Sequence, residues 1–177
     1  LGTGLISDIF FVAFRFPNTF RRIFSEGALN SAFVPIYTKL VKENLIQESQ
    51  KFAGNILTIF FITALFLVLI VEIFMPYFIH LIAPGFSNDI NKFDELVRIS
   101  RIIFPFLIFI SVSSIYSSIL NSNNKFALSA ALPIILNVTL IFSLVFAYKI
   151  GENYLTFLAW GVAIAGILQV IILYLSL

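Results

Sequence analysis

Long apolar runs constrain this sequence more than any other feature. Phe52–Val71, Phe126–Ala147 and Tyr154–Leu177 each contain no charged residue over roughly 20 positions, and Ile102–Leu120 is also uncharged, though rich in serine. A helix needs about 20 apolar residues to cross the hydrocarbon of a bilayer. Inside lipid, only helices and closed barrels satisfy every backbone polar group. We therefore expect an all-α, multi-pass transmembrane bundle.

Composition supports the same class. Hydrophobic residues make up 60% of the chain and charged residues 11%, whereas soluble domains carry about 25% charged residues. A net charge of +2 without a basic stripe gives no sign of nucleic-acid binding. The chain has no cysteine and one histidine, so we expect no thiol chemistry, metal site or cofactor.

Short polar segments separate the apolar runs. Counting the charged segment Leu5–Phe24, we expect about five helices in a single transmembrane region, residues 1–177, without a soluble domain. The chain begins at Leu1 rather than Met and stops inside an apolar run, so we interpret it as the interior of a longer protein. The expected connections are residues 39–51, 83–101, 121–125 and 149–153.

The segment Leu5–Phe24 is unusual because it contains four charges. Each would cost roughly 2.5–3.5 kcal/mol at the membrane centre, or up to ~10–14 kcal/mol together, against ~4–7 kcal/mol returned by its apolar residues. The segment must therefore turn its charges toward protein or water. Pro17 is expected to kink or loosen the helix, as at many transporter sites. The charged residues are Asp8, Arg15, Arg21 and Arg22.

The spacing of the polar residues places them on one stripe of this helix. Asp8, Arg15 and Arg22 are seven residues apart, and Asn18, Arg22 and Glu26 are four apart. Such a stripe would line a hydrated cavity between helices.

Arginine is suited to phosphate because its planar fork donates two parallel charged hydrogen bonds. Arg15, Arg21 and Arg22 could bind a diphosphate, with Asp8 and Glu26 holding them in place or taking part in a charge-coupled gate. Two simpler interpretations stay open. Arg21 and Arg22 could be anchors at the helix end, and Arg15 could pair with Asp8 across two turns.

The run Asp8–Pro35 (DIFFVAFRFPNTFRRIFSEGALNSAFVP) resembles the second-helix region of the MurJ/MviN lipid II flippase family. Its pattern F-P-N-x-x-R-R-x-x-x-E-G-A mixes apolar, charged and helix-breaking residues. The resemblance extends over essentially the whole chain through shorter matches at Ala83–Phe86, Phe104–Pro105, Ile119–Asn121 and Pro133–Asn137.

This resemblance implies a fourteen-helix member of the multidrug/oligosaccharidyl-lipid/polysaccharide exporter superfamily. The chain would supply its second to sixth helices, a fragment of the N-terminal lobe that lacks the first helix and the C-terminal half. Such proteins are not enzymes. They move lipid II, an undecaprenyl-diphosphate-linked disaccharide-pentapeptide, across the bacterial inner membrane for peptidoglycan synthesis. The implied partners are lipid II, membrane lipids and the cell-wall synthesis machinery.

The resemblance also implies roles for individual residues of a central cationic cavity. Arg21 is the first candidate for contact with the diphosphate or nearby headgroup, and Arg22 the second. Asn18 and Glu26 would order these arginines, and Asp8 would lie toward the outer side. An alternative is an exporter of another polyprenyl-linked oligosaccharide or a drug/cation antiporter, although an antiporter should present mainly carboxylates.

Other polar and small residues admit both packing and functional interpretations. Ser111, Ser114 and Ser118 share one helix face, and they either touch a cavity or serve helix packing. Pro133 and Asn137 could likewise kink the helix, line a cavity or serve packing. The small residues of the last helix, among them Gly161 and Gly166, indicate close helix approach.

Overall fold

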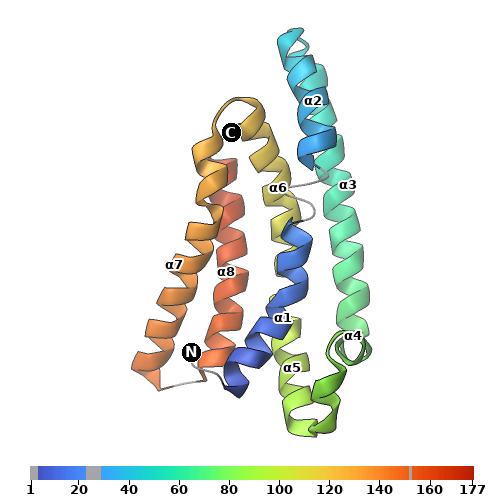
Figure 1. The fold of residues 1–177 in the computed structure, drawn as a ribbon. Coiled ribbons are helices and arrows are strands. Elements are labelled where there is room, and N and C mark those ends of the chain that lie inside the picture. The colour runs from blue at the N-terminus through green and yellow to red at the C-terminus, as the bar shows by residue number, and fades with distance from the viewer. Residues whose placement is uncertain (1–3, 23–28, 152) are drawn as a thin grey trace.

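The computed structural model describes residues 4–22, 29–151 and 153–177, and helices dominate throughout these ranges (Figure 1). The expected all-α bundle is confirmed. The elements are α1 (Leu5–Arg22), α2 (Leu29–Lys42), α3 (Ile46–Ile73), α4 (Met75–Ile82), the short 3-10 helix η2 (Pro84–Asn88), α5 (Ile90–Ile103), α6 (Phe106–Ser122), α7 (Phe126–Ile150) and α8 (Tyr154–Tyr174).

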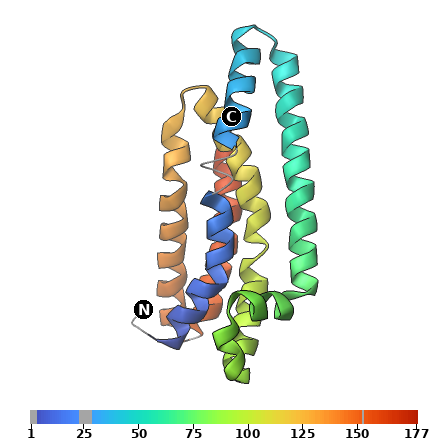
Figure 2. The same cartoon turned by 45° about the vertical axis from the view of Figure 1, so that its right-hand side comes forward.

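Four stretches of the described chain are long and apolar enough to cross a membrane: Ile46–Ile73, Ile90–Ser122, Phe126–Ile150 and Tyr154–Tyr174. They correspond to the four uncharged runs of the sequence. The charged helix α1 lies beside them and packs against α5, α6 and α8 (Figures 1 and 2). The chain is therefore a membrane-embedded bundle in which the charged helix packs with one face against α5, α6 and α8 and leaves its other face uncovered.

Aromatic side chains hold α1 in this position. Ile9 and Phe10 are buried, the Phe16 ring stacks on Phe104 with centroids 5.5 Å apart, and the Phe14 ring lies 6.0 Å from that of Phe106. These contacts fix one face of α1 against the α5–α6 segment and leave its other face available for polar residues.

The predictions of loops at residues 39–51 and 83–101 are both wrong, because both segments are mostly helical. Residues 39–51 are mostly helical, because α2 continues to Lys42 and α3 begins at Ile46, with a turn at Asn44, whose φ is 58°. Lysine, glutamate and glutamine are good helix formers, and Lys39 lies 3.9 Å from Glu43 on the exposed surface. Charge there indicates a helix in contact with water rather than a loop.

Residues 83–101 form η2 and most of α5 instead of an irregular connection. Asp89 caps α5 by accepting hydrogen bonds from the N–H groups of Asn91 and Lys92. Leu96 and Ile99 are fully buried, so α5 is amphipathic. Its charged residues made the segment look like a loop although its apolar residues recur at helical spacing.

The other two expected connections are confirmed as short turns. α6 ends at Ser122 and α7 begins at Phe126, with Asn124 in the left-handed region at φ 61°. Gly151 ends α7 at φ 75°, a conformation that glycine adopts without strain. The side chain of Asn153 then accepts a 3.0 Å hydrogen bond from the Leu155 N–H and caps α8.

Close helix approach in α8 is also confirmed. A Cβ added to Gly166 would lie 2.6 Å from Cδ2 of Phe106, and one added to Gly161 would collide with the Ser143 side chain. Helix α8 therefore contacts α6 on one side and α7 on the other across glycines. By contrast, α3 and α7 expose many large apolar side chains, such as Phe66 and Phe142, as expected of surfaces that face lipid or further protein.

Candidate functional site

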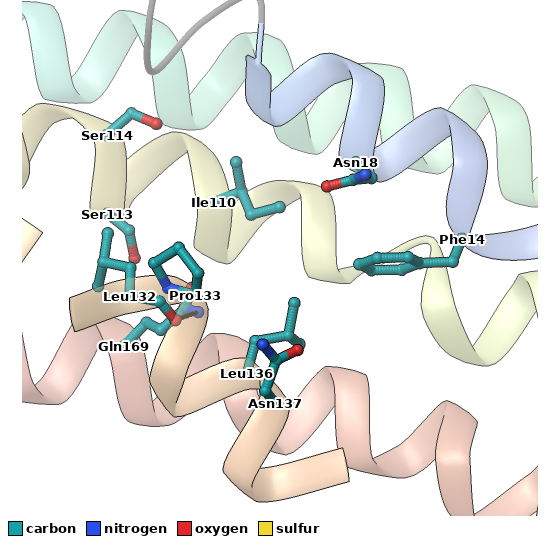
Figure 3. Close-up of a pocket in the computed structure, with 10 residues that line it drawn as sticks. All are labelled: Phe14, Asn18, Ile110, Ser113, Ser114, Leu132, Pro133, Leu136, Asn137 and Gln169. Carbon is teal, nitrogen blue, oxygen red and sulfur yellow. Dashed lines mark hydrogen bonds between the residues drawn. The ribbon is translucent and has the colours of Figure 1, made fainter. Parts of the chain in front are cut away.

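A hollow of about 240 Å³ lies between α1, α6, α7 and α8 (Figure 3). We call it the neutral hollow, because none of the described residues that line it is ionisable. Both polar and apolar side chains form its wall. They are Phe14, Asn18, Ile110, Ser113, Ser114, Leu132, Pro133, Leu136, Asn137 and Gln169.

The polar groups of the neutral hollow come from all four helices. Gln169 of α8 is only 3% exposed, and its Nε2 donates a 2.9 Å hydrogen bond to the carbonyl oxygen of Leu132 in α7. Ser113 of α6 is also 3% exposed, and its hydroxyl has no hydrogen-bond partner within the described part of the chain. Figure 3 shows Asn18 entering from α1 and Asn137 from α7. Uncharged hydrogen-bonding groups thus converge inside a membrane bundle.

The sequence also explains why α7 contributes to this wall. Pro133 lies inside α7 and has no N–H, so the helix loses one backbone hydrogen bond at that point. Nearby, the Ser129 hydroxyl donates a 3.3 Å hydrogen bond to the carbonyl oxygen of Ser117 in α6, and Gln169 bonds to Leu132. A side chain of α7 therefore bonds to the backbone of α6, and a side chain of α8 bonds to the backbone of α7, close to Pro133.

The residues of the expected polar stripe do not share one described hollow. Asn18 is half-buried and lines the neutral hollow, whereas Arg15 is exposed and lines a separate hollow of about 340 Å³ with Val12, Phe16, Thr19 and Ile82. Asp8 is exposed. Helix α1 continues past Pro17, and the Pro17 side chain is buried. Asp8 and Arg15 thus lie on a face of α1 that this chain itself leaves uncovered.

The remaining predicted residues lie at the limit of the described structure. Arg21 and Arg22 form the last two positions of α1, but their side chains are outside the described part. Glu26 lies outside the described residues altogether. Their proposed roles therefore stay predictions.

Two polar residues of the neutral hollow, Ser113 and Gln169, were not expected from the sequence. Gln169 is the one amide in the apolar run Tyr154–Leu177, and this isolated polar residue could have indicated an internal contact. Ser113 gave no such signal, because it is one of several closely spaced serines in α6. Pro133 and Asn137, left open above, do line the hollow.

The serines on one face of α6 have different surroundings, some consistent with helix packing and others with lining a cavity. The hydroxyls of Ser111 and Ser118 donate 2.8 and 2.9 Å hydrogen bonds to carbonyl oxygens of their own helix, one turn back, which fits a packing role. Ser111 also lines a small, mainly apolar hollow of about 80 Å³. Ser114 lines the neutral hollow instead. The position of a serine on the helix therefore does not show by itself whether its hydroxyl bonds to its own helix or lines a cavity.

Comparison with known proteins identifies the family. A sequence model described as "Lipid II flippase MurJ" matches residues 1–177, the whole chain. The chain belongs to the MurJ family. Its relatives include a "Probable lipid II flippase MurJ" of Rhizobium tropici, 40% identical over 99% of this chain, and one of Rickettsia prowazekii (strain Madrid E), 41% identical over 98%. Each alignment covers 34% of the relative.

A solved MurJ structure has a fold similar to that of this chain. "Lipid II flippase MurJ, inward closed conformation" superposes with a TM-score of 0.77 at 30% sequence identity, covering 99% of this chain and 36% of that one. The chain therefore spans about a third of the length of these MurJ proteins. It is a multi-pass membrane segment of a transporter family rather than of a family of catalytic enzymes.

Proposed function

We propose that this chain forms the second to sixth helices in the N-terminal lobe of a lipid II flippase. The complete protein would move undecaprenyl-diphosphate-linked disaccharide-pentapeptide from the inner to the outer leaflet of the bacterial plasma membrane by alternating access. The family match over residues 1–177 carries this proposal. A polar hollow inside an otherwise apolar bundle supports it, because polar groups at membrane depth usually mark a transport pathway.

Binding of the headgroup would depend on the arginines of α1. We infer that Arg21 contacts the diphosphate, that Arg22 assists it, and that Glu26 orders both. A diphosphate needs cationic, multidentate donors, and arginine supplies them in a fixed planar arrangement. No bond is made or broken in the substrate, so translocation requires binding and release but no general acid, base or nucleophile.

The exposed charges of α1 support a water-filled chamber on this face. Asp8 and Arg15 are exposed in the described chain, and an ion facing lipid at the membrane centre would cost roughly 2.5–3.5 kcal/mol each. We infer that in the complete protein this face of α1 borders water and the remaining helices. The polyprenyl tail would stay in the lipid while the headgroup crosses through that chamber.

Complementation tests the proposal. The full-length protein that contains this segment is expressed in a bacterium depleted of its own flippase, either as wild type or with Arg21→Ala or Lys149→Ala. Lys149 is a matched cation at the end of α7. We expect growth with wild type and Lys149→Ala and no growth with Arg21→Ala at equal membrane abundance. Failure of the wild type would refute the function, and normal growth with Arg21→Ala would refute the role of Arg21.

A further inference from the structure

The neutral hollow has a chemistry different from that of a phosphate site. We propose that it is a subsite for the uncharged sugar part of the lipid-linked headgroup, recognised through hydroxyl and amide groups. This inference rests on the proposed function, and it gives the hollow a ligand of its own. The diphosphate would lie outside it, at the C-terminal end of α1.

Charge excludes the diphosphate from the hollow itself. Among the residues whose side chains the structure describes, none that lines the hollow is cationic, and burying an anion without a compensating charge is strongly unfavourable. Neutral ligands that carry both donors and acceptors match the wall better. The Asn18, Asn137 and Gln169 amides each present both kinds of group, as do sugar hydroxyl and acetamido substituents.

The buried serine provides the second argument. The hydroxyl of Ser113 is buried against the hollow, and it lacks a hydrogen-bond partner among the residues that the structure describes. A buried polar group without a partner is destabilising, and native proteins seldom retain one without a reason. A ligand hydroxyl or carbonyl in the hollow would satisfy it.

Size and position limit how much of the headgroup enters. At about 240 Å³, the hollow is smaller than the roughly 300–1,000 Å³ typical of sites for whole ligands, which fits one ring rather than a complete disaccharide-pentapeptide. Phe14, Ile110 and Leu136 supply apolar contact. Asn18 precedes Arg21 by three residues of α1, or about 4.5 Å along the helix axis, which suits a sugar attached directly to a diphosphate.

A binding comparison tests the subsite. The full-length protein is reconstituted in nanodiscs, and its affinity is measured for lipid II and for undecaprenyl diphosphate, which has the same anion and tail but no sugar. The variants are Ser113→Ala and Asn137→Leu. Thr58→Val is the control, because Thr58 is exposed on α3 and its hydroxyl bonds only to its own helix at Gly54.

We expect the wild type to bind lipid II more tightly than undecaprenyl diphosphate. Ser113→Ala should weaken lipid II binding roughly two- to ten-fold, the size of one neutral hydrogen bond, without changing undecaprenyl diphosphate binding and without lowering thermal stability. Asn137→Leu should act in the same direction, and Thr58→Val should change nothing.

Three results would overturn the inference. Equal wild-type affinity for both lipids would remove the sugar subsite but leave diphosphate binding and the proposed function intact. Equal loss for both lipids in Ser113→Ala and Asn137→Leu would show a purely structural role. Unchanged affinities in both variants would mean that the hollow holds water alone. Absence of wild-type binding to either lipid would instead contradict the proposed function.

Discussion

Replacement of Gly166 by alanine tests the packing of α8 most sharply. The new Cβ would lie 2.6 Å from Cδ2 of Phe106 and 2.9 Å from Cβ of Phe109. Phe106 is fully buried, and the Phe109 Cβ is fixed to its backbone, so neither atom can move away freely. Overpacking of this kind costs about 1–3 kcal/mol.

Helix propensity complicates the magnitude, because alanine gains ~0.8–1 kcal/mol over glycine inside a helix. Gly54→Ala in α3 removes this complication. Apart from the adjacent residues and the backbone of its own helix, no described heavy atom lies within 4 Å of the Cβ position there, so this control receives the propensity gain without the collision. The difference in the free energy of unfolding between the two variants should therefore be about 1–3 kcal/mol, with Gly166→Ala less stable.

The assay is reversible unfolding of the purified full-length protein in mixed micelles, followed by circular dichroism. Gly161→Ala should fall between the two variants, because the colliding Ser143 hydroxyl can rotate away by giving up its 2.9 Å hydrogen bond to the carbonyl oxygen of Thr139. Equal stability of the Gly166 and Gly54 variants would refute the close approach of α8 to α6.

Two further predictions concern α5. Hydrogen bonding from the Lys92 N–H holds the pKa of Asp89 below its ordinary value of 3.8, so its contribution to stability is complete above that pH and is lost as the pH falls below it. Asp89→Ala should therefore destabilise the protein at neutral pH, and the difference from wild type should shrink in acid; unfolding midpoints measured across this range check it. Arg98 bonds to Glu95 at 2.7 Å and to the Thr156 hydroxyl of α8 at 3.0 Å. Arg98→Ala should cost about 0.2–1 kcal/mol, and a double-mutant cycle with Thr156→Val would show no coupling if this link between α5 and α8 contributed nothing.

The membrane helices could be predicted from the sequence because each is defined by a local property, an uncharged apolar run long enough to cross the bilayer. An uncharged run of the required length has few alternatives in lipid. The loop predictions at residues 39–51 and 83–101 are wrong because charged residues also occur on helices that contact water. In α5, Leu96 and Ile99 lie on a buried face while Glu95 and Arg98 pair on the other side.

The spacing along α1 placed Asn18 on a polar stripe expected to line a cavity, and Asn18 does line the neutral hollow. Its role in binding stays a prediction. Ser113 and Gln169 join it only because α6 and α8 approach α7 in one particular register, with Gln169 bonded to the Leu132 carbonyl. That register depends on packing between distant segments, which no local pattern of α6 or α8 shows.

In the complete protein, the polar side chains of α1 should face water at membrane depth. This segment contains no cysteine, so single cysteines can be introduced at Asn18 or at Phe142, an exposed position of α7, in full-length protein freed of other cysteines. Intact membranes are then treated with a charged, membrane-impermeant thiol reagent. We expect modification of Asn18→Cys, suppressed by lipid II, and no modification of Phe142→Cys. An Asn18→Cys variant as unreactive as Phe142→Cys, in protein that still supports growth, would contradict this expectation.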